Sequence, residues 1–367
     1  MKDSLKALML LNACEKFNGP FWNFFQGKGL EPRQLWEEAD ATGRLLNMPE
    51  GALNRIRELV SRDWVEREYE KCQDRGIRIL SLEDPHYPEI LSGSPHSPLV
   101  IYLQGCNLSF NDTVSIVGTR KCTRYGRSVS YHLAGSIASS GGTVISGGAR
   151  GIDMYAHEGA LSSKGKTLAV LGTGIDIVYP GSNEGLFSRI KEQGALLSEY
   201  PLGTPGKRWR FPRRNRIIAG LSDVTVVVEA PRKSGAMITA NYAAEAGRDV
   251  WAVPGRIDEE VSRGTNNLIS DGASPLVDIK AFTAHVFSGQ LEIFGQKEDN
   301  SHFKEEEGLS EGEKAVLGIL RQSGDRTVDN ISSECKMSAA DALTCLGNLL
   351  AKGMVYPAGP GRWRAGS

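Results

Sequence analysis

The middle of the chain alternates continuous apolar runs with segments of helical periodicity. The apolar runs are rich in β-branched residues and cover 113–118, 143–146, 167–172, 195–200, 223–230 and 249–255. Such runs, separated by helices, predict a parallel sheet that is buried on both faces. We therefore expect an α/β fold with an extended Rossmann-like core over residues 112–287. Because the carboxyl ends of parallel strands share one edge, the loops that follow them should form the ligand crevice.

The two flanking regions have other patterns. Residues 1–107 place leucine and isoleucine at helical spacings and contain a short turn at 45–51, which predicts a helical domain similar to SAM or helix-hairpin-helix modules. Residues 288–308 are polar and predict a linker. Residues 309–367 predict three helices (311–322, 327–336 and 338–352) and then two strands around a Gly/Pro turn, the order of a winged-helix domain. The charges of this last domain nearly balance, which favours a protein contact at least as much as duplex binding.

Bulk composition limits the classes of function. The chain has 43 Lys and Arg against 44 Asp and Glu, so any nucleic-acid site must be local. The six cysteines form no CxxC pair, which indicates reduced thiols and neither a zinc site nor a redox motif. The apolar run near the start resembles a lipoprotein signal that ends at Cys14, but Lys6 interrupts it, so an amphipathic first helix is favoured. No segment reaches transmembrane length. We therefore expect a cytoplasmic protein.

Positive charge is concentrated in one segment, residues 206–216, with the sequence GKRWRFPRRNR. Its cations surround Trp209 and Phe211, and they are Lys207, Arg208, Arg210, Arg213, Arg214 and Arg216. Guanidinium groups that alternate with aromatic rings suit single-stranded nucleic acid, because phosphates meet the cations and unstacked bases meet the rings. The alternative is a solvated loop, but an apolar helical pattern resumes at once in residues 215–221.

Four glycine-containing loops follow the predicted strands. They contain Gly118, Thr119 and Arg120, with Thr123 opening the next helix; Ser146, Gly147 and Gly148; Gly172 and Gly174; and Ser234 and Gly235. Glycine lets backbone N–H groups converge on an anion, and a helix N-terminus adds its dipole. One such loop could be only a tight turn, whereas four at one edge predict a row of phosphate contacts.

Cofactor and catalytic motifs are missing from these loops. The first loop reads GTRKCTRYG rather than GxGxxG, the second strand ends without a ribose-binding acid, and no GxxxxGK[ST] occurs. His157 follows Asp153 by four residues but has no evident third metal ligand, so a capping Asp153 and a packed His157 are favoured. Glu229 ends a strand without a paired base. We expect no cofactor, no metal and no catalytic residue.

Seven sequence blocks resemble the DNA-processing protein A family (DprA, also called Smf). They are SIVGTRKCTRYG, ISGGARGIDMYAH, LAVLGTGIDIVYPGSN, SEYPLGT, FPRRNRIIAGLSDVTVVVEA, SGAMITANYAAEAGRDVWAVPG and RGTNNLISDGA, in order over residues 112–275. The resemblance implies a non-enzymatic protein with a Rossmann core that usually dimerises. It would bind single-stranded DNA without sequence preference, shield it during natural transformation, and load the RecA recombinase in place of the single-strand-binding protein.

The resemblance also implies roles for particular residues. Arg120 would clamp a phosphate, while Arg213 and Asn215 would hold the DNA backbone. Arg214 and Arg216 would lie nearby, and the glycines of SGGA and LGTG would donate N–H groups. Many family members carry a DNA-contacting lysine after the Tyr-Pro of the third block. Here Gly181 stands at that position, so the contact is lost or comes from Lys207 or Arg208.

Two other functions stay open. A related Rossmann variant is found in nucleotide-processing phosphoribohydrolases, which carry PGGxGTxxE with a working glutamate. The corresponding residues here, 230–239, lack that carboxylate, which disfavours the enzyme. The remaining alternative is an adaptor protein whose glycine loops bind nothing.

Overall fold

The structure is a computed structural model that describes residues 2–287, 309–323, 326–351, 354–359 and 362–365. The chain divides into two compact units, Met1–Ser288 and Gly289–Ser367, which are described separately. The predicted linker, 288–308, lies outside the described residues. None of the described helices combines the length and the apolar character that crossing a bilayer requires.

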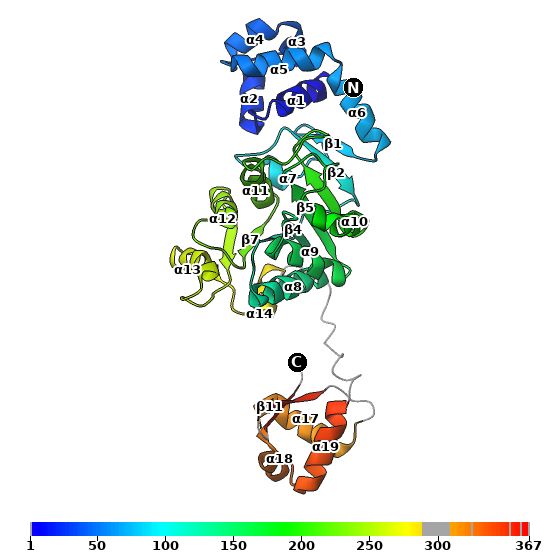
Figure 1. The fold of residues 1–367 in the computed structure, drawn as a ribbon, viewed down its shortest axis with the longest axis vertical. Coiled ribbons are helices and arrows are strands. Elements are labelled where there is room, and N and C mark those ends of the chain that lie inside the picture. Colours follow the sequence, from blue (N-terminus) through cyan, green and yellow to red (C-terminus); the bar gives the residue numbers. More distant parts are fainter. Residues whose placement is uncertain (1, 288–308, 324–325, 352–353, 360–361, 366–367) are drawn as a thin grey trace. The chain divides into compact units, whose positions relative to one another are not determined.

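The first unit is built on a nine-stranded sheet with the order β1-β2-β6-β5-β4-β3-β7-β8-β9 (Figure 1). The strands are β1 (Arg78–Ser81), β2 (Val100–Gly105), β3 (Thr113–Val117), β4 (Thr143–Ser146), β5 (Lys166–Leu171), β6 (Ala195–Ser198), β7 (Val224–Val227), β8 (Asp249–Ala252) and β9 (Ser274–Pro275). All pairs from β6 to β9 are parallel, whereas β1-β2 and β2-β6 are antiparallel. The predicted α/β fold and its mostly parallel sheet are confirmed, with one strand in each of the six apolar runs.

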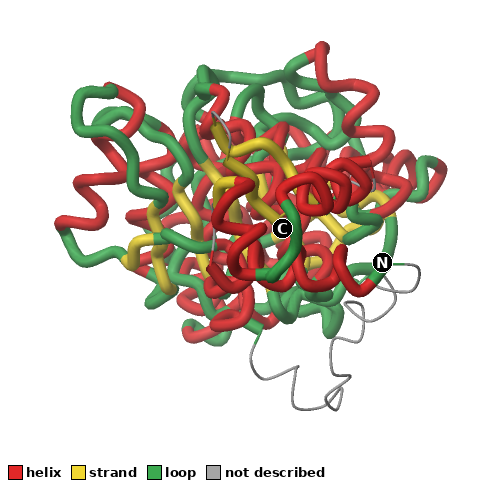
Figure 2. The backbone as a smooth tube through the Cα atoms, turned by 90° about the horizontal axis from the view of Figure 1, so that it is seen from below, coloured by secondary structure: helices red, strands yellow, loops and turns green. Residues whose placement is uncertain are grey.

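Helices cover both faces of the sheet, as Figure 2 shows. One face packs against α8 (Arg124–Ser139), α9 (Ile152–Ser162), α10 (Glu184–Gln193) and α14 (Ile279–Val286). The other face packs against α11 (Arg210–Gly220) and α12 (Gly235–Glu245), through residues such as Ile217 and Ala240. The helix α13 (Arg263–Ser270) precedes β9. Burial on both faces explains why the strands are apolar along their whole length.

The N-terminal helices share a core with the sheet. They are α1 (Asp3–Ala13), α2 (Gly19–Gly27), α3 (Gln34–Glu37), α4 (Ala39–Leu45), α5 (Glu50–Ser61) and α6 (Trp64–Asp74). Leu8, Trp22 and Ile56 belong to the same buried cluster as Leu171 of β5 and Phe187 of α10. Residues 78–105, within the region predicted to be helical, contain two strands. After α6 the chain forms β1, the short α7 (Glu89–Ser92) and β2, because the apolar run 99–103 is buried and joins the sheet.

Within its described residues, the second unit contains three helices and a small antiparallel sheet. The elements are α17 (Glu311–Ser323), β10 (Arg326–Thr327), α18 (Val328–Glu334), α19 (Ala339–Ala351), β11 (Val355–Gly359) and β12 (Arg362–Ala365). The sheet has the order β10-β12-β11. Its core includes Leu317, Ile331, Leu346 and Leu349.

Candidate nucleic-acid interface

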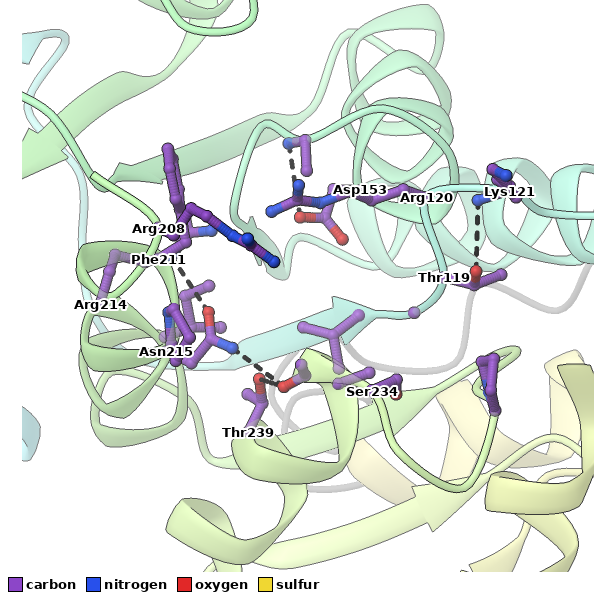
Figure 3. Close-up of a pocket in the computed structure, with 18 of the residues that line it drawn as sticks. Thr119, Arg120, Lys121, Asp153, Arg208, Phe211, Arg214, Asn215, Ser234 and Thr239 are labelled. Atoms are coloured by element: carbon purple, nitrogen blue, oxygen red, sulfur yellow. Dashed lines mark hydrogen bonds between the residues drawn. The ribbon is translucent and has the colours of Figure 1, made fainter. Parts of the chain in front are cut away.

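The carboxyl ends of the central strands open into two adjoining pockets, of about 510 and 530 Å³. Arg120, Lys121, Ala149, Tyr179, Phe211 and Arg214 line both pockets, which we call together the groove. Further lining residues come from the loops after β3, β4, β5 and β7, from the segment before α11, and from α9, α11 and α12: Gly118, Thr119, Gly147, Arg150, Asp153, Pro180, Gly181, Arg208, Asn215, Ser234, Gly235 and Thr239. The crevice predicted at this edge of the sheet is therefore present (Figure 3).

Three cations of the groove are exposed and available to a ligand. The side chains of Arg120, Lys121 and Arg208 make no hydrogen bond or ion pair with any residue that the structure describes. The guanidinium of Arg120 lies 5.6 Å from the centre of the Phe211 ring. Exposed guanidinium and ammonium groups without a protein partner are the groups that phosphates neutralise.

An aromatic surface adjoins these cations. The rings of Tyr179 and Phe211 lie 5.0 Å apart and are tilted by 32°. Tyr179 and Trp209 are each about half exposed. Aromatic rings beside a cationic groove give unstacked bases a surface on which to stack.

Arg214 and Asn215 hold the floor of the groove. Arg214 is buried, and its Nη1 donates to the carbonyl of Gly147 at 2.7 Å and also to that of Val170. Burial lowers the pKa of Arg214 to about 10, so the guanidinium stays charged at neutral pH. Asn215 Nδ2 donates to the carbonyl of Gly235 at 3.0 Å. These two side chains thus tie α11 to the loops after β4 and β7.

Three arginines of the basic segment are used within the fold, contrary to the expectation that the whole segment faces a ligand. Arg210 is buried and makes a two-point ion pair with Glu15, at 3.0 and 2.6 Å. Arg216 is buried and pairs with Glu199, while its Nη1 donates to a backbone carbonyl. Arg213 contacts the carbonyl of Glu15, and its Nε lies 3.8 Å from Glu199. We therefore leave these arginines out of the proposed ligand contacts.

Most of the loop glycines are required by packing inside the protein. A Cβ on Gly118, Gly147, Gly172 or Gly174 would collide with Ile152, Arg214, Phe211 or the carbonyl of Pro201, respectively. Gly148 has a φ of +64° and packs against Phe187. Their presence is therefore not evidence for an anion. Gly235 differs, because it begins α12 at the groove, and the nearest atom to its Cβ position is 3.7 Å away.

Two predicted hydroxyl contacts also serve the fold and do not line the groove. Ser146 Oγ donates to the carbonyl of Ile116 at 2.7 Å. Thr123 caps α8 by accepting from Gly126 N, and its own N–H and hydroxyl donate to Glu229. Lys207 is exposed but does not line the groove.

The candidate catalytic residues are held by the fold as well. Asp153 is buried and accepts a long hydrogen bond from Ala149 N at 3.4 Å, and burial raises the pKa of its carboxyl. His157 is fully buried and hydrogen-bonds Thr167. The carboxylate of Glu229 accepts hydrogen bonds from Thr123. Across the described residues, no group of three or more potential metal ligands comes together.

Sequence reasoning missed Lys121, Arg150 and Tyr179 as groove residues. Lys121 follows Arg120 directly, and Arg150 ends the second glycine loop, so adjacency to the recognised loops was the available signal. Tyr179 comes from a segment beyond the third loop, and only the fold brings it next to Phe211.

The chain is similar over most of its length to curated proteins. It is 35% identical over 348 residues to "Putative DNA processing protein DprA" of Mycobacterium tuberculosis, a match that covers 86% of this chain and 87% of that protein. It is 41% identical to "Protein Smf" of Synechocystis sp. over 62% of this chain, and it spans only 59% of the length of that protein.

Two solved structures share the fold. The X-ray structure of DNA processing protein A from Streptococcus pneumoniae has a TM-score of 0.65 and 31% identity, and the match covers 77% of this chain and 98% of that one. DNA processing protein A from Helicobacter pylori, whose structure concerns its "unique single-stranded DNA binding mode", has a TM-score of 0.53 and 29% identity, with 58% and 96% covered. The family described as "DNA recombination-mediator protein A" matches residues 78–287. The groove therefore lies in the segment that defines the family, and this chain belongs to the DNA recombination-mediator protein A family.

Proposed function

We propose that the groove binds single-stranded DNA without sequence preference. The observation that carries this proposal is the exposed, unpaired Arg120 beside Phe211, with Lys121 and Arg208 around the same opening. The cations would neutralise phosphates, and the Tyr179–Phe211 surface would accept bases. Stacking tolerates every base, which gives affinity without base-edge readout. The Helicobacter pylori relative, whose title names single-stranded DNA, supports the same ligand.

Membership of a recombination-mediator family supports a role in DNA processing during transformation and recombination. We propose that the protein protects incoming single strands and loads the RecA recombinase on them, displacing the single-strand-binding protein. In this role it is a cytoplasmic DNA-binding protein of the competence pathway and not an enzyme.

The quaternary and domain organisation is also proposed. Ile257 and Val277 are 88% and 79% exposed, and they follow the neighbouring strands β8 and β9 at the end of the sheet. We propose a homodimer, and these two exposed apolar side chains are candidates for its interface. We propose that residues 1–107 form a SAM-like or helix-hairpin-helix-like domain, and that residues 309–367 form a winged helix. The exposed Leu343 and Leu350 on α19 favour a protein contact for that domain.

The nucleotide-processing alternative lacks a free carboxylate in the groove. The acidic residue that lines it, Asp153, is buried and bonded to the backbone. Incubation of the protein with nucleoside monophosphates should release no free base. Release of free base that co-purifies with the protein would support the enzyme instead.

Titration of the full chain with labelled single-stranded and duplex oligonucleotides tests the proposal. Single strands should bind at least about tenfold more tightly than duplex, because only they present unstacked bases to Tyr179 and Phe211. Affinity should fall with salt, with a logarithmic slope of about −0.7 for each phosphate that is neutralised. Fluorescence anisotropy over a salt series measures both quantities. Equal affinity for duplex, or binding that ignores salt, would contradict the proposal.

Gly181→Lys should strengthen single-strand binding several-fold. Gly181 lines the groove, no atom lies within 4 Å of its Cβ position, and its φ is outside the left-handed region. The added ammonium should steepen the salt slope by about 0.7 if it gains one phosphate. Gly185→Lys is the matched control, because Gly185 is equally open but does not line the groove. An equal gain in affinity in both variants would indicate a general charge effect. Unchanged affinity and salt slope in Gly181→Lys would indicate that the DNA does not pass Gly181.

A further inference from the structure

Apart from the two pockets of the groove, a separate pocket of about 530 Å³ lies at the β1 end of the sheet. It shares no residue with the groove. Its walls come from α6, β1, the segment after β1, β2 and the segment after β2. The volume is within the range of pockets that bind small molecules or single side chains. Neither the basic segment nor the glycine loops contribute to it.

Arg78 of β1 is the cation of this pocket and has no partner. Its side chain makes no hydrogen bond or ion pair with any described residue, and its Nη2 is shielded from solvent. A guanidinium nitrogen that is buried without an acceptor is costly, because the lost hydration is not replaced. Arg78 is half-buried, whereas the buried Arg210 and Arg216 each have a carboxylate partner. Arg78 is therefore arranged for an acceptor from outside the chain.

The rest of the lining is mainly apolar. Ile79, Leu80, Leu103, Leu108 and Phe110 surround the pocket. Its polar side chains besides Arg78 include the amides of Gln73 and Asn107, the phenol of Tyr69, and His86, whose ring lies 3.2 Å from Asp84. A guanidinium holds a carboxylate in a two-point geometry, and the apolar wall can cover a hydrocarbon or aromatic group attached to it. The lining thus suits a ligand with one anionic end and one apolar end.

The charges near the inner wall argue against a phosphate. Cys72 lines the pocket, and burial, with smaller contributions from Glu68 and Asp176, raises the pKa of its thiol to about 12. Asp176 is paired with Arg75 at 3.0 Å, which leaves Glu68 as the carboxylate that acts on this wall. A singly charged carboxylate tolerates Glu68 better than a phosphate of higher charge does.

We propose that this pocket binds a carboxylate that carries an apolar group. Arg78 holds the carboxylate, and Leu103, Leu108 and Phe110 cover the apolar group. This chemistry has two sources, a free apolar acid or the C-terminus of a peptide that ends in an apolar residue. The site is separate from DNA binding and does not depend on it.

Calorimetric titration of the full chain with N-acetyl-phenylalanine tests the proposal. The acid should bind, and N-acetyl-phenylalaninamide, which lacks the charge, should bind at least about thirtyfold more weakly. Arg78→Gln should weaken binding of the acid to a similar extent, because it removes the cation. Arg44→Gln is the matched control, since Arg44 is exposed, unpaired among the described residues and outside the pocket.

A short peptide that ends in phenylalanine, in free-acid and amidated forms, distinguishes the two sources. A free-acid peptide that binds more tightly than N-acetyl-phenylalanine indicates a protein terminus, and equal binding indicates a small acid. Equal binding of acid and amide would overturn the proposal, as would no binding of the acid. The proposal would also be overturned if an Arg78→Gln variant that unfolds at the same temperature as the parent chain binds the acid equally well. A Leu108→Ala variant, which should weaken the acid and keep its preference over the amide, covers the case in which Arg78→Gln does not fold.

Discussion

The His157→Gln variant is expected to lose much less stability in acid than the parent chain. His157 is fully buried, and burial lowers the pKa of its imidazole from 6.5 to about 3. Thr167 Oγ1 uses its proton on the carbonyl of Val144, so it accepts from His157 Nδ1–H at 2.7 Å. The other ring nitrogen, Nε2, is a buried acceptor without a partner among the described residues. Protonation would place a charge there without an acceptor.

The direction follows from which state binds the proton. Below pH 6.5 the unfolded chain protonates His157 and the folded chain does not, so stability falls as the pH falls from 6.5 towards 3. The loss is about 1.4 kcal/mol per pH unit, or about 2 kcal/mol at pH 5, relative to a variant without the imidazole. Asp153 titrates in both chains, so the difference between them isolates the histidine. Urea unfolding of both chains between pH 7.5 and 5 measures it, and parallel pH profiles would contradict the buried neutral imidazole.

Glu199→Ala should be among the most destabilising single substitutions in the first unit. Glu199 is buried and pairs with Arg216, and Arg213 lies 3.8 Å away. Its removal leaves the buried Arg216 without a counter-charge, which costs about 3–5 kcal/mol. Chemical unfolding at neutral pH gives the change in the free energy of unfolding.

Glu58→Ala is the control for that substitution. The side chain of Glu58 on α5 is 40% exposed, and it pairs with Arg55 and Arg62 at 2.8 and 3.1 Å. Surface pairs of this kind contribute at most about 1 kcal/mol. Similar, small losses in both variants would mean that Arg216 finds other partners or water when Glu199 is absent.

The sheet and the position of the groove could be predicted because both depend on local pattern. Apolar β-branched runs such as 113–118 and 223–230 can be satisfied only by a sheet that is covered on both faces. Arg120 and Ser234 follow β3 and β7, which are parallel neighbours, so both residues lie at the edge of the sheet where these strands end.

The division of the basic segment could not be predicted, because it depends on contacts distant in sequence. Arg208 and Arg210 are two residues apart and both cationic, yet Arg208 lines the groove and Arg210 pairs with Glu15, which follows α1. The same holds for Gly147. Arg214, which is 67 residues further along the chain, occupies the space that a Cβ on Gly147 would need. Charge and glycine content therefore indicated the right region but did not separate ligand contacts from structural ones.

The Arg120→Ala variant shows whether the exposed cations of the groove bind the phosphates of single-stranded DNA. Arg120 contacts the Phe211 ring but has no hydrogen bond or ion pair to lose, so thermal unfolding should be nearly unchanged. Single-strand affinity should fall about tenfold or more, and the salt slope should become shallower by about 0.7. Arg44→Ala, which removes an exposed arginine outside the groove, should bind as the parent chain does. Unchanged affinity and salt slope in a folded Arg120→Ala variant would contradict the claim.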